Sequence, residues 1–105
     1  MDAKNVKIVD CYGYYDGAVC GVCKHEDDFF IFRLAGDFFD SDKVDSRLYV
    51  MRRLNSDEIL LLKDNEAMKS LLGGLTPLNA GYYILSDDSG HTFDRWWDAR
   101  MTGWP

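Results

Sequence analysis

Hydrophobic and polar positions alternate along the first half of the chain with the period of a β-strand. In the segment 6–12, Val6, Ile8 and, less cleanly, Asp10 alternate with Lys7, Val9 and Cys11, a two-residue period that is typical of a strand. Further apolar runs follow, separated by the turn signal at 14–17 and the polar segment 25–28. The pattern predicts four strands, at 6–12, 18–24, 29–35 and 47–54, and a long acidic loop at 36–47.

The hydrophobic period changes after residue 54. Asn55 followed by Glu58 resembles a helix capping box, with Ser56 as an alternative cap. The segments 56–65 and 65–74 then predict two short helices, or one bent helix. We expect five apolar side chains of this region to face the sheet: Leu60, Leu61, Met68, Leu71 and Leu72.

A return to strand character follows the helical region. Residues 82–86 predict a fifth strand, and 91–97 a sixth that returns as its hairpin mate after the turn 87–90. The predicted fold class is therefore α+β. It comprises an antiparallel, curved sheet of about five to six strands, with two short helices (or one bent helix) inserted between strands four and five. Phe29, Phe30 and Phe32 put aromatic bulk on both faces of their strand, so we expect both faces of the sheet to be covered.

Length and composition indicate one globular domain. The chain has 105 residues, of which 47% are hydrophobic and 14% aromatic, so we expect a single compact domain over 1–105. No stretch approaches the roughly 20 apolar residues that span a bilayer, and the first residues do not resemble a signal peptide. The three cysteines leave at least one thiol unpaired, which favours a reducing compartment. We expect a cytoplasmic protein without membrane contact.

The charge balance argues against nucleic acid as a partner. The chain carries 12 basic and 18 acidic residues, for a net charge of −6, whereas a nucleic-acid binder needs clustered cations to displace counterions from phosphates. An acidic surface promotes solubility in any case. It also suits a protein partner with a basic surface, including one that would otherwise receive nucleic acid.

One segment contains all three cysteines. Cys20 and Cys23 have the C-x-x-C spacing of dithiol and zinc sites, but the helix that lowers a thiol pKa in dithiol enzymes is missing from the pattern. Residues three apart on a strand point to opposite faces. A bulge at Gly21 could bring these thiols together with Cys11 and His25 as a zinc site, yet structural zinc sites usually have two ligand pairs. The sequence favours a hairpin with small buried thiols, and it predicts no cofactor.

The predicted acidic loop is a candidate for calcium or partner binding. Its spacing lacks the central glycine and terminal glutamate of an EF-hand loop, so a solvated loop is favoured, with its two phenylalanines anchoring it or lying exposed. The residues concerned are Asp37, Phe38, Phe39, Asp40, Asp42 and Asp45.

Three tryptophans lie in the last ten residues. Trp96 and Trp97 are adjacent and cannot share a face, so one can pack inward while the other stays partly exposed. Tryptophan is over-represented at interface hot spots, which makes Trp96, Trp97 and Trp104 candidate partner anchors. The alternative is that this segment covers the open end of the sheet.

Several short motifs resemble those of a group of small bacterial proteins of unknown function. These motifs are "VDCYGYYDGAVCGVC", "FFIFRLA", "RLYVMRRLNSDEILLL" and "MKSLLGGL", which together cover about the first two thirds of the chain. The proline that commonly follows YYDG in that group is replaced here by Ala18. The resemblance implies the strand order and a bacterial or phage source, but no activity.

Two functional hypotheses remain. The favoured one is a small acidic non-enzymatic protein-binding module, such as an inhibitor, immunity or anti-defence factor that covers a basic surface of its partner; a homodimer would also suit exposed aromatic edges. The alternative is a small enzyme or a ligand-binding or metal-binding domain that uses His91, Asp94 and the Cys20/Cys23 hairpin.

Overall fold

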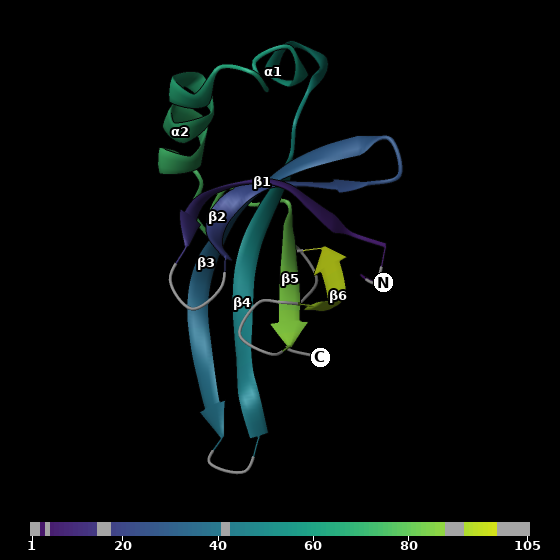
Figure 1. Cartoon of the computed structure of the whole chain (residues 1–105), viewed down its shortest axis with the longest axis vertical. Helices are drawn as coiled ribbons and strands as arrows, with labels where there is room; N and C mark the ends of the chain where they lie inside the picture. Colours follow the sequence, from purple (N-terminus) through teal and green to yellow (C-terminus); the bar gives the residue numbers. More distant parts are fainter. Residues whose placement is uncertain (1–2, 4, 15–17, 41–42, 88–91, 99–105) are drawn as a thin grey trace.

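Six strands form one antiparallel sheet in chain order. The computed structural model describes residues 3, 5–14, 18–40, 43–87 and 92–98, and each strand pairs with the next one along the chain (Figure 1). Two helices follow the fourth strand, so the predicted antiparallel sheet with two helices is confirmed. The elements are β1 (Lys7–Tyr14), β2 (Ala18–His25), β3 (Asp28–Asp40), β4 (Lys43–Arg53), α1 (Ser56–Ile59), α2 (Asn65–Gly73), β5 (Tyr82–Asp87) and β6 (Thr92–Asp98).

The prediction of a long loop at 36–47 is wrong. β3 continues to Asp40 and β4 begins at Lys43, and Phe38 pairs with Ser46 in the ladder between them. Aromatic and β-branched residues such as Phe38, Phe39 and Val44 favour extended backbone, and this preference outweighs the turn character of the aspartates. The predicted turn at 14–17 lies outside the described residues except for Tyr14, which ends β1.

A tight turn joins β2 to β3. His25 pairs with Asp28, so only Glu26 and Asp27 connect the strands. Glu26 has a φ of 55°, because two-residue hairpin loops that match the twist of the strands require positive φ at the first central residue. The connection predicted at 25–28 therefore consists of only two residues, because His25 and Asp28 belong to the strands.

Gly21 allows β1 to lie close to β2. A side chain at this position would collide with the main-chain oxygen of Asp10. β1 is also irregular, with register shifts between Ile8 and Asp10 and again around Gly13. Bulges of this kind bend a strand, and the absence of a side chain at Gly21 gives the bent strand room.

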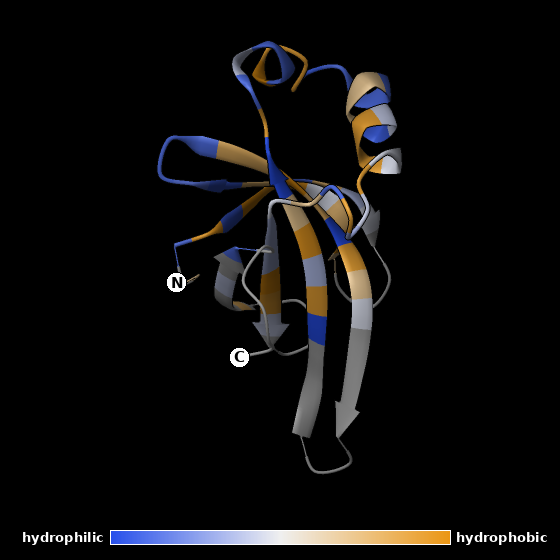
Figure 2. Cartoon of the chain, turned by 180° about the vertical axis from the view of Figure 1, so that it is seen from behind, coloured by the Kyte–Doolittle hydropathy of each residue, from blue (hydrophilic) through white to orange (hydrophobic). Residues whose placement is uncertain are grey.

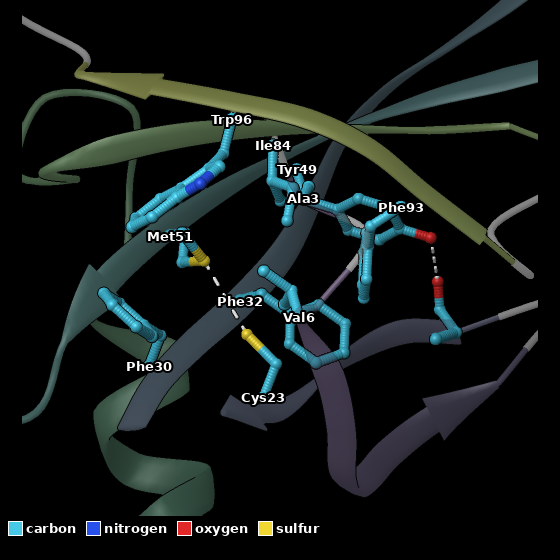
Figure 3. Packing of buried hydrophobic residues seen from close by; sticks show 11 residues of the cluster. Ala3, Val6, Cys23, Phe30, Phe32, Tyr49, Met51, Ile84, Phe93 and Trp96 are labelled. Atoms are coloured by element: carbon cyan, nitrogen blue, oxygen red, sulfur yellow. Dashed lines mark hydrogen bonds between the residues drawn. The ribbon is translucent and has the colours of Figure 1, made fainter. Parts of the chain in front are cut away.

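The sheet is strongly curved around one of its faces. β2 and β6 are four strands apart in the sheet order, which would be about 19 Å in a flat sheet at about 4.8 Å per strand. The ring centroids of His25 on β2 and Trp96 on β6 are nevertheless 5.4 Å apart. We call the buried cluster inside this curve the concave core (Figure 3): Ala3, Val6, Ala18, Cys23, Phe30, Phe32, Tyr49, Met51, Ile84, Phe93 and Trp96.

A second buried cluster lies on the opposite face, where α2 packs. We call it the helix-side core, and it consists of Val22, Ile31, Val50, Leu54, Met68, Leu72 and Leu75. Successive residues of the central strands alternate between the two clusters, as Tyr49, Val50 and Met51 do. This double burial explains why large side chains on both faces of the middle of β4 are buried, and Figure 2 shows hydrophobic bands there with a paler band between them.

The predicted sheet-facing side of the helical region is only partly correct. Met68 and Leu72 are buried, but Leu60 is 81% exposed and Leu61 is 38% exposed. The reason is that α1 ends at Ile59 after four residues, so the chain turns before Leu60 and Leu61 could reach the sheet. Ile59 and Leu62 pack against the helix-side core instead.

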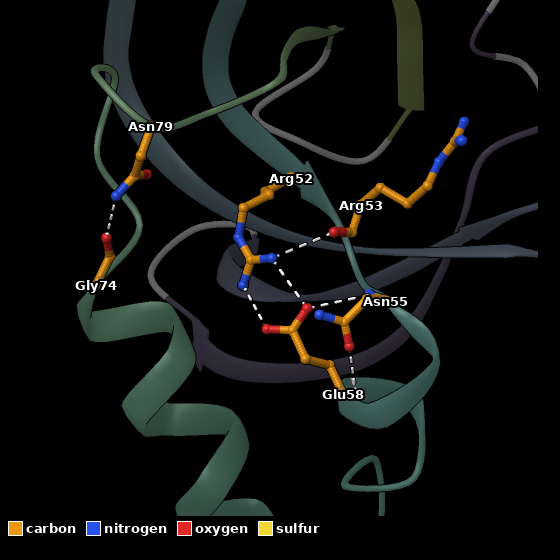
Figure 4. A network of polar contacts seen from close by, with 6 residues as sticks. All are labelled: Arg52, Arg53, Asn55, Glu58, Gly74 and Asn79. Atoms are coloured by element: carbon orange, nitrogen blue, oxygen red, sulfur yellow. Dashed lines mark hydrogen bonds and ion pairs between the residues drawn. The ribbon is translucent and has the colours of Figure 1, made fainter.

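The predicted capping box begins α1. The side-chain oxygen of Asn55 accepts a hydrogen bond from the backbone N–H of Glu58 at 2.9 Å, and the Glu58 carboxylate accepts one from the Asn55 backbone at 3.0 Å. Arg52 at the end of β4 donates two further hydrogen bonds to the same carboxylate, at 3.0 and 2.8 Å (Figure 4). The network fixes the direction in which the chain leaves the sheet.

Candidate functional site

The far end of the β3–β4 hairpin is a two-stranded ribbon that projects from the sheet. β2 pairs with β3 only as far as Arg33, and β5 pairs with β4 only as far as Arg47. Beyond these points, within the described part of the chain, 34–40 pair only with β4 and 43–46 pair only with β3. Figure 1 shows both strands running past the end of β5. We call 34–40 and 43–46 the projecting ribbon.

The projecting ribbon carries many of the predicted partner-binding residues. Asp37 lies opposite Arg47, Asp40 lies opposite Lys43, and Asp45 is on β4. Phe38 and Phe39 are on β3, with Phe39 at a register shift between Phe38 and Asp40. Asp42 lies outside the described residues. The structure therefore places all of these positions except Asp42 on paired strands with outer edges that no other described strand occupies.

Charge is concentrated in this hairpin. Residues 36–46 contain four aspartates and one lysine, which gives −3, half of the net charge of −6 of the whole chain. A charged two-stranded ribbon resists edge-to-edge aggregation. Its acidity also creates a local negative potential that attracts positively charged partners.

The tryptophan predictions have different outcomes. Trp96 is 6% exposed, and its ring lies 5.5 Å from that of Phe30 and 5.0 Å from that of Tyr82. The interpretation of Trp96 as an exposed anchor is corrected by this burial, since the ring closes the concave core. Trp97 is on β6 opposite Tyr83, and Trp104 lies outside the described residues.

The cysteine segment forms a hairpin, and its thiols do not converge. Cys23 lies in the concave core, with its Sγ 3.6 Å from the sulfur of Met51, whereas Cys20 packs against the helix-side core. Cys11 is exposed on β1, and its thiol donates to the carbonyl of Gly13 at 3.0 Å. His25 instead packs on Trp96. Among the described residues there is no group of three or more His, Cys, Asp or Glu side chains that could hold a metal ion.

Burial makes the thiols of β2 poor nucleophiles. It raises the pKa of Cys23 to about 12. It also raises the pKa of Cys20, where proximity to Cys11 adds to the effect and Arg33 opposes it. Since the thiolate is the reactive form, neither group is activated for catalysis. His91, the other candidate of the enzyme hypothesis, lies outside the described residues, and Asp94 is on β6.

A pocket that the sequence does not predict lies beside α2. This pocket of about 440 Å³ is lined by Tyr12, Val19, Cys20, Arg33, Lys69, Leu72 and Gly73, and we call it the Arg33 pocket. A smaller one of about 260 Å³ lies on the other side of the same arginine, against Val50 and Leu75. In the sequence, the only sign of this pocket is a single arginine, Arg33, inside the aromatic run of β3. The other residues that line the pocket come from β1, β2 and α2, which only the fold brings together.

Comparisons with known proteins give no relatives. No protein-family model matches the chain, and no curated protein or solved structure is significantly similar to it.

The helices of the described residues are short. None of them is both long and apolar enough to cross a membrane.

Proposed function

We propose that this protein is a small acidic protein-binding module, and that the projecting ribbon engages a basic surface of its partner. The partner would be a protein whose active or nucleic-acid-binding surface is covered on binding, as an inhibitor, immunity or anti-defence factor does. We place the protein in the cytoplasm, where its free cysteines would remain reduced.

The observation that carries the proposal is the combination of position and charge in the ribbon. A ribbon whose outer edges no other described strand occupies, in a hairpin whose residues 36–46 contain half of the net charge, can reach a partner without any change in the core. Its outer edges offer backbone groups for strand addition, and its aspartates would steer a basic partner during encounter. Trp97 and Trp104 remain candidate anchors of this proposal, whereas Trp96 does not.

The test compares two double variants with the same change in net charge. Asp37→Lys/Asp45→Lys alters the ribbon, and Asp57→Lys/Glu66→Lys alters the exposed first turns of α1 and α2. Affinity capture from a lysate of the source organism with the tagged full chain identifies the partner by mass spectrometry. Stopped-flow or surface plasmon resonance measurements then give association rates at low and high ionic strength.

We expect the ribbon variant to associate at least about tenfold more slowly than the native chain at low salt, and the helix variant to be affected much less, because steering depends on where the charge lies. The difference should shrink at high salt. Equal rates for the two variants would refute the ribbon as the binding element. A captured partner with an acidic surface would refute the proposal as a whole.

A further inference from the structure

A row of cross-strand neighbours forms the floor of the Arg33 pocket. Cys20 on β2 pairs with Arg33 on β3, and Gly13 on β1 pairs with Cys20. Directly paired residues project from the same face of a sheet, and here the face is that of the helix-side core, against which Tyr12 and Cys20 pack. The floor therefore combines a phenol, a thiol and a guanidinium on adjacent strands.

α2 supplies the opposite wall and a second cation. Lys69, Leu72 and Gly73 line the pocket, and residues three and four apart lie on the same face of a helix. Leu72 is buried and anchors this face on the sheet, while Lys69 is exposed. A Cβ at Gly73 would meet nothing within 4 Å, so the space beside this residue is open.

No residue that the structure describes neutralises the positive charge of this pocket. Its described lining contains two basic residues and no carboxylate, with Asp10 close to Tyr12 at its margin, and neither Arg33 nor Lys69 forms an ion pair with any described residue. Arg33 donates one hydrogen bond, to the carbonyl of Leu75 at 3.4 Å, which leaves most of its five N–H donors for other acceptors. The chain as a whole has a net charge of −6. Two cations that lack ion-pair partners among the described residues therefore make the surroundings of this cavity locally positive.

Polar and apolar parts of the lining are separated. Val19 and Leu72 supply apolar surface. The hydroxyl of Tyr12 is buried, and it makes no hydrogen bond of good geometry in the described part of the chain, although Asp10 lies near it. Such a group normally costs free energy unless a ligand or water satisfies it. Burial raises the pKa of Tyr12, and the charge of the nearby Asp10 and hydrogen bonding toward it add to this, so at neutral pH the phenol keeps its proton.

We propose that the Arg33 pocket binds a small amphipathic carboxylate, with the carboxylate between Arg33 and Lys69 and the hydrocarbon part against Val19 and Leu72. The volume of about 440 Å³ lies in the range of small-molecule sites. Arginine suits this role because its planar donor group matches a carboxylate. The site is distinct from the projecting ribbon and does not depend on the proposed protein partner.

Cys20 reports occupancy of the pocket in the native chain. Octanoate serves as the probe, with octan-1-ol as the uncharged analogue and acetate as the charge without the chain. The rate at which iodoacetamide alkylates Cys20 is measured against probe concentration, and peptide mapping separates this thiol from Cys11, which is exposed outside the pocket. We expect octanoate to slow alkylation of Cys20 in a saturable way and to leave Cys11 unaffected, with much weaker effects from octan-1-ol and acetate.

Variants then test the two cations. Arg33→Gln and Lys69→Gln should each raise the half-saturating octanoate concentration about tenfold, which is the effect of losing one charge-assisted contact. Lys63→Gln, an exposed lysine outside the pocket, should leave it unchanged. The half-saturating concentration is compared rather than the rate, because Arg33 also lowers the pKa of Cys20.

Three results would overturn the proposal. These are no protection of Cys20 by octanoate, equal protection by octan-1-ol, or native affinity in both the Arg33→Gln and Lys69→Gln variants. Circular dichroism checks that each variant is folded, and the exposed position of Lys69 on α2 makes its variant the safer of the two.

Discussion

The hydroxyl of Tyr49 on β4 donates a hydrogen bond of 2.6 Å to the carbonyl of Ala18 on β2, although β3 lies between the two strands. Two strands separated by a third are about 9.6 Å apart in a flat sheet, so the contact spans the concave side (Figure 3). Arg47 donates to the same carbonyl at 3.4 Å. The side chains of β4 thus hold the beginning of β2 over the concave core, which ties β2 to the strand at the base of the projecting ribbon.

Removal of this hydroxyl should destabilise the fold without changing its shape. We expect Tyr49→Phe to lower the free energy of unfolding by about 1 kcal/mol, the usual contribution of a buried hydrogen bond. Tyr82→Phe is the control, because no hydrogen bond of its hydroxyl is found within the described residues, and its effect should stay within about 0.5 kcal/mol. Urea denaturation measures both values. Equal effects of the two variants would mean that the Ala18 contact contributes nothing.

The close approach of β1 to β2 predicts a strong effect at Gly21. In Gly21→Ala the added methyl group would overlap the main-chain oxygen of Asp10, and since backbone cannot move aside as a side chain can, we expect a loss of about 3 kcal/mol or more in the free energy of unfolding. Gly36→Ala is the matched control on β3, because a Cβ there meets nothing within 4 Å, and its effect should be small. A loss below about 1 kcal/mol at Gly21 would show that β1 can shift away.

The sequence was sufficient for the order of elements because each one has its own local signal. The two-residue period, the turn at Glu26-Asp27 and the capping box of Asn55 and Glu58 all depend on near neighbours. The strands at 36–47 were not predicted, because aspartates considered one by one favour a loop. Their extended conformation is stabilised by the ladder between β3 and β4, which the local sequence does not show.

The candidate sites depended on long-range packing and were less predictable. The burial of Trp96 requires the curvature that brings β6 against β2. The separation of Cys20 from Cys23 onto opposite faces follows from strand geometry and was predicted. The Arg33 pocket could not be predicted, because Lys69 reaches it only through the packing of α2 on the sheet.

The ion pair between Arg52 and Glu58 predicts acid sensitivity. The hydrogen bond from Arg52 is the main cause that lowers the pKa of Glu58 below its usual 4.5. A carboxyl group with a lowered pKa in the folded state stabilises the fold above its unfolded pKa, and this contribution is lost as the pH falls through the folded value. In Glu58→Gln we therefore expect a lower free energy of unfolding at pH 7, by roughly 0.5–1 kcal/mol for this partly exposed pair, and a weaker decline below pH 4.5.

Chemical denaturation between neutral and acidic pH measures this difference, with Glu66→Gln as the control. Glu66 is exposed in the first turn of α2, and its variant should keep the native pH profile. If Glu58→Gln also follows the native profile, the ion pair does not contribute to stability.

The buried thiol of Cys23 leads us to expect a loss of stability at alkaline pH. Burial raises the pKa of its thiol from 9.0 to about 12, so the folded state keeps the proton that the unfolded state releases above pH 9. The free energy of unfolding should therefore fall as the pH rises from 9 towards 12, by at most about 1.4 kcal/mol per pH unit for one proton. Cys23→Ala loses packing at every pH, but its stability should decline less steeply in this range. Cys11→Ala, which removes an exposed thiol, should keep the native slope, and an equally steep decline in Cys23→Ala would show that another group causes the alkaline transition.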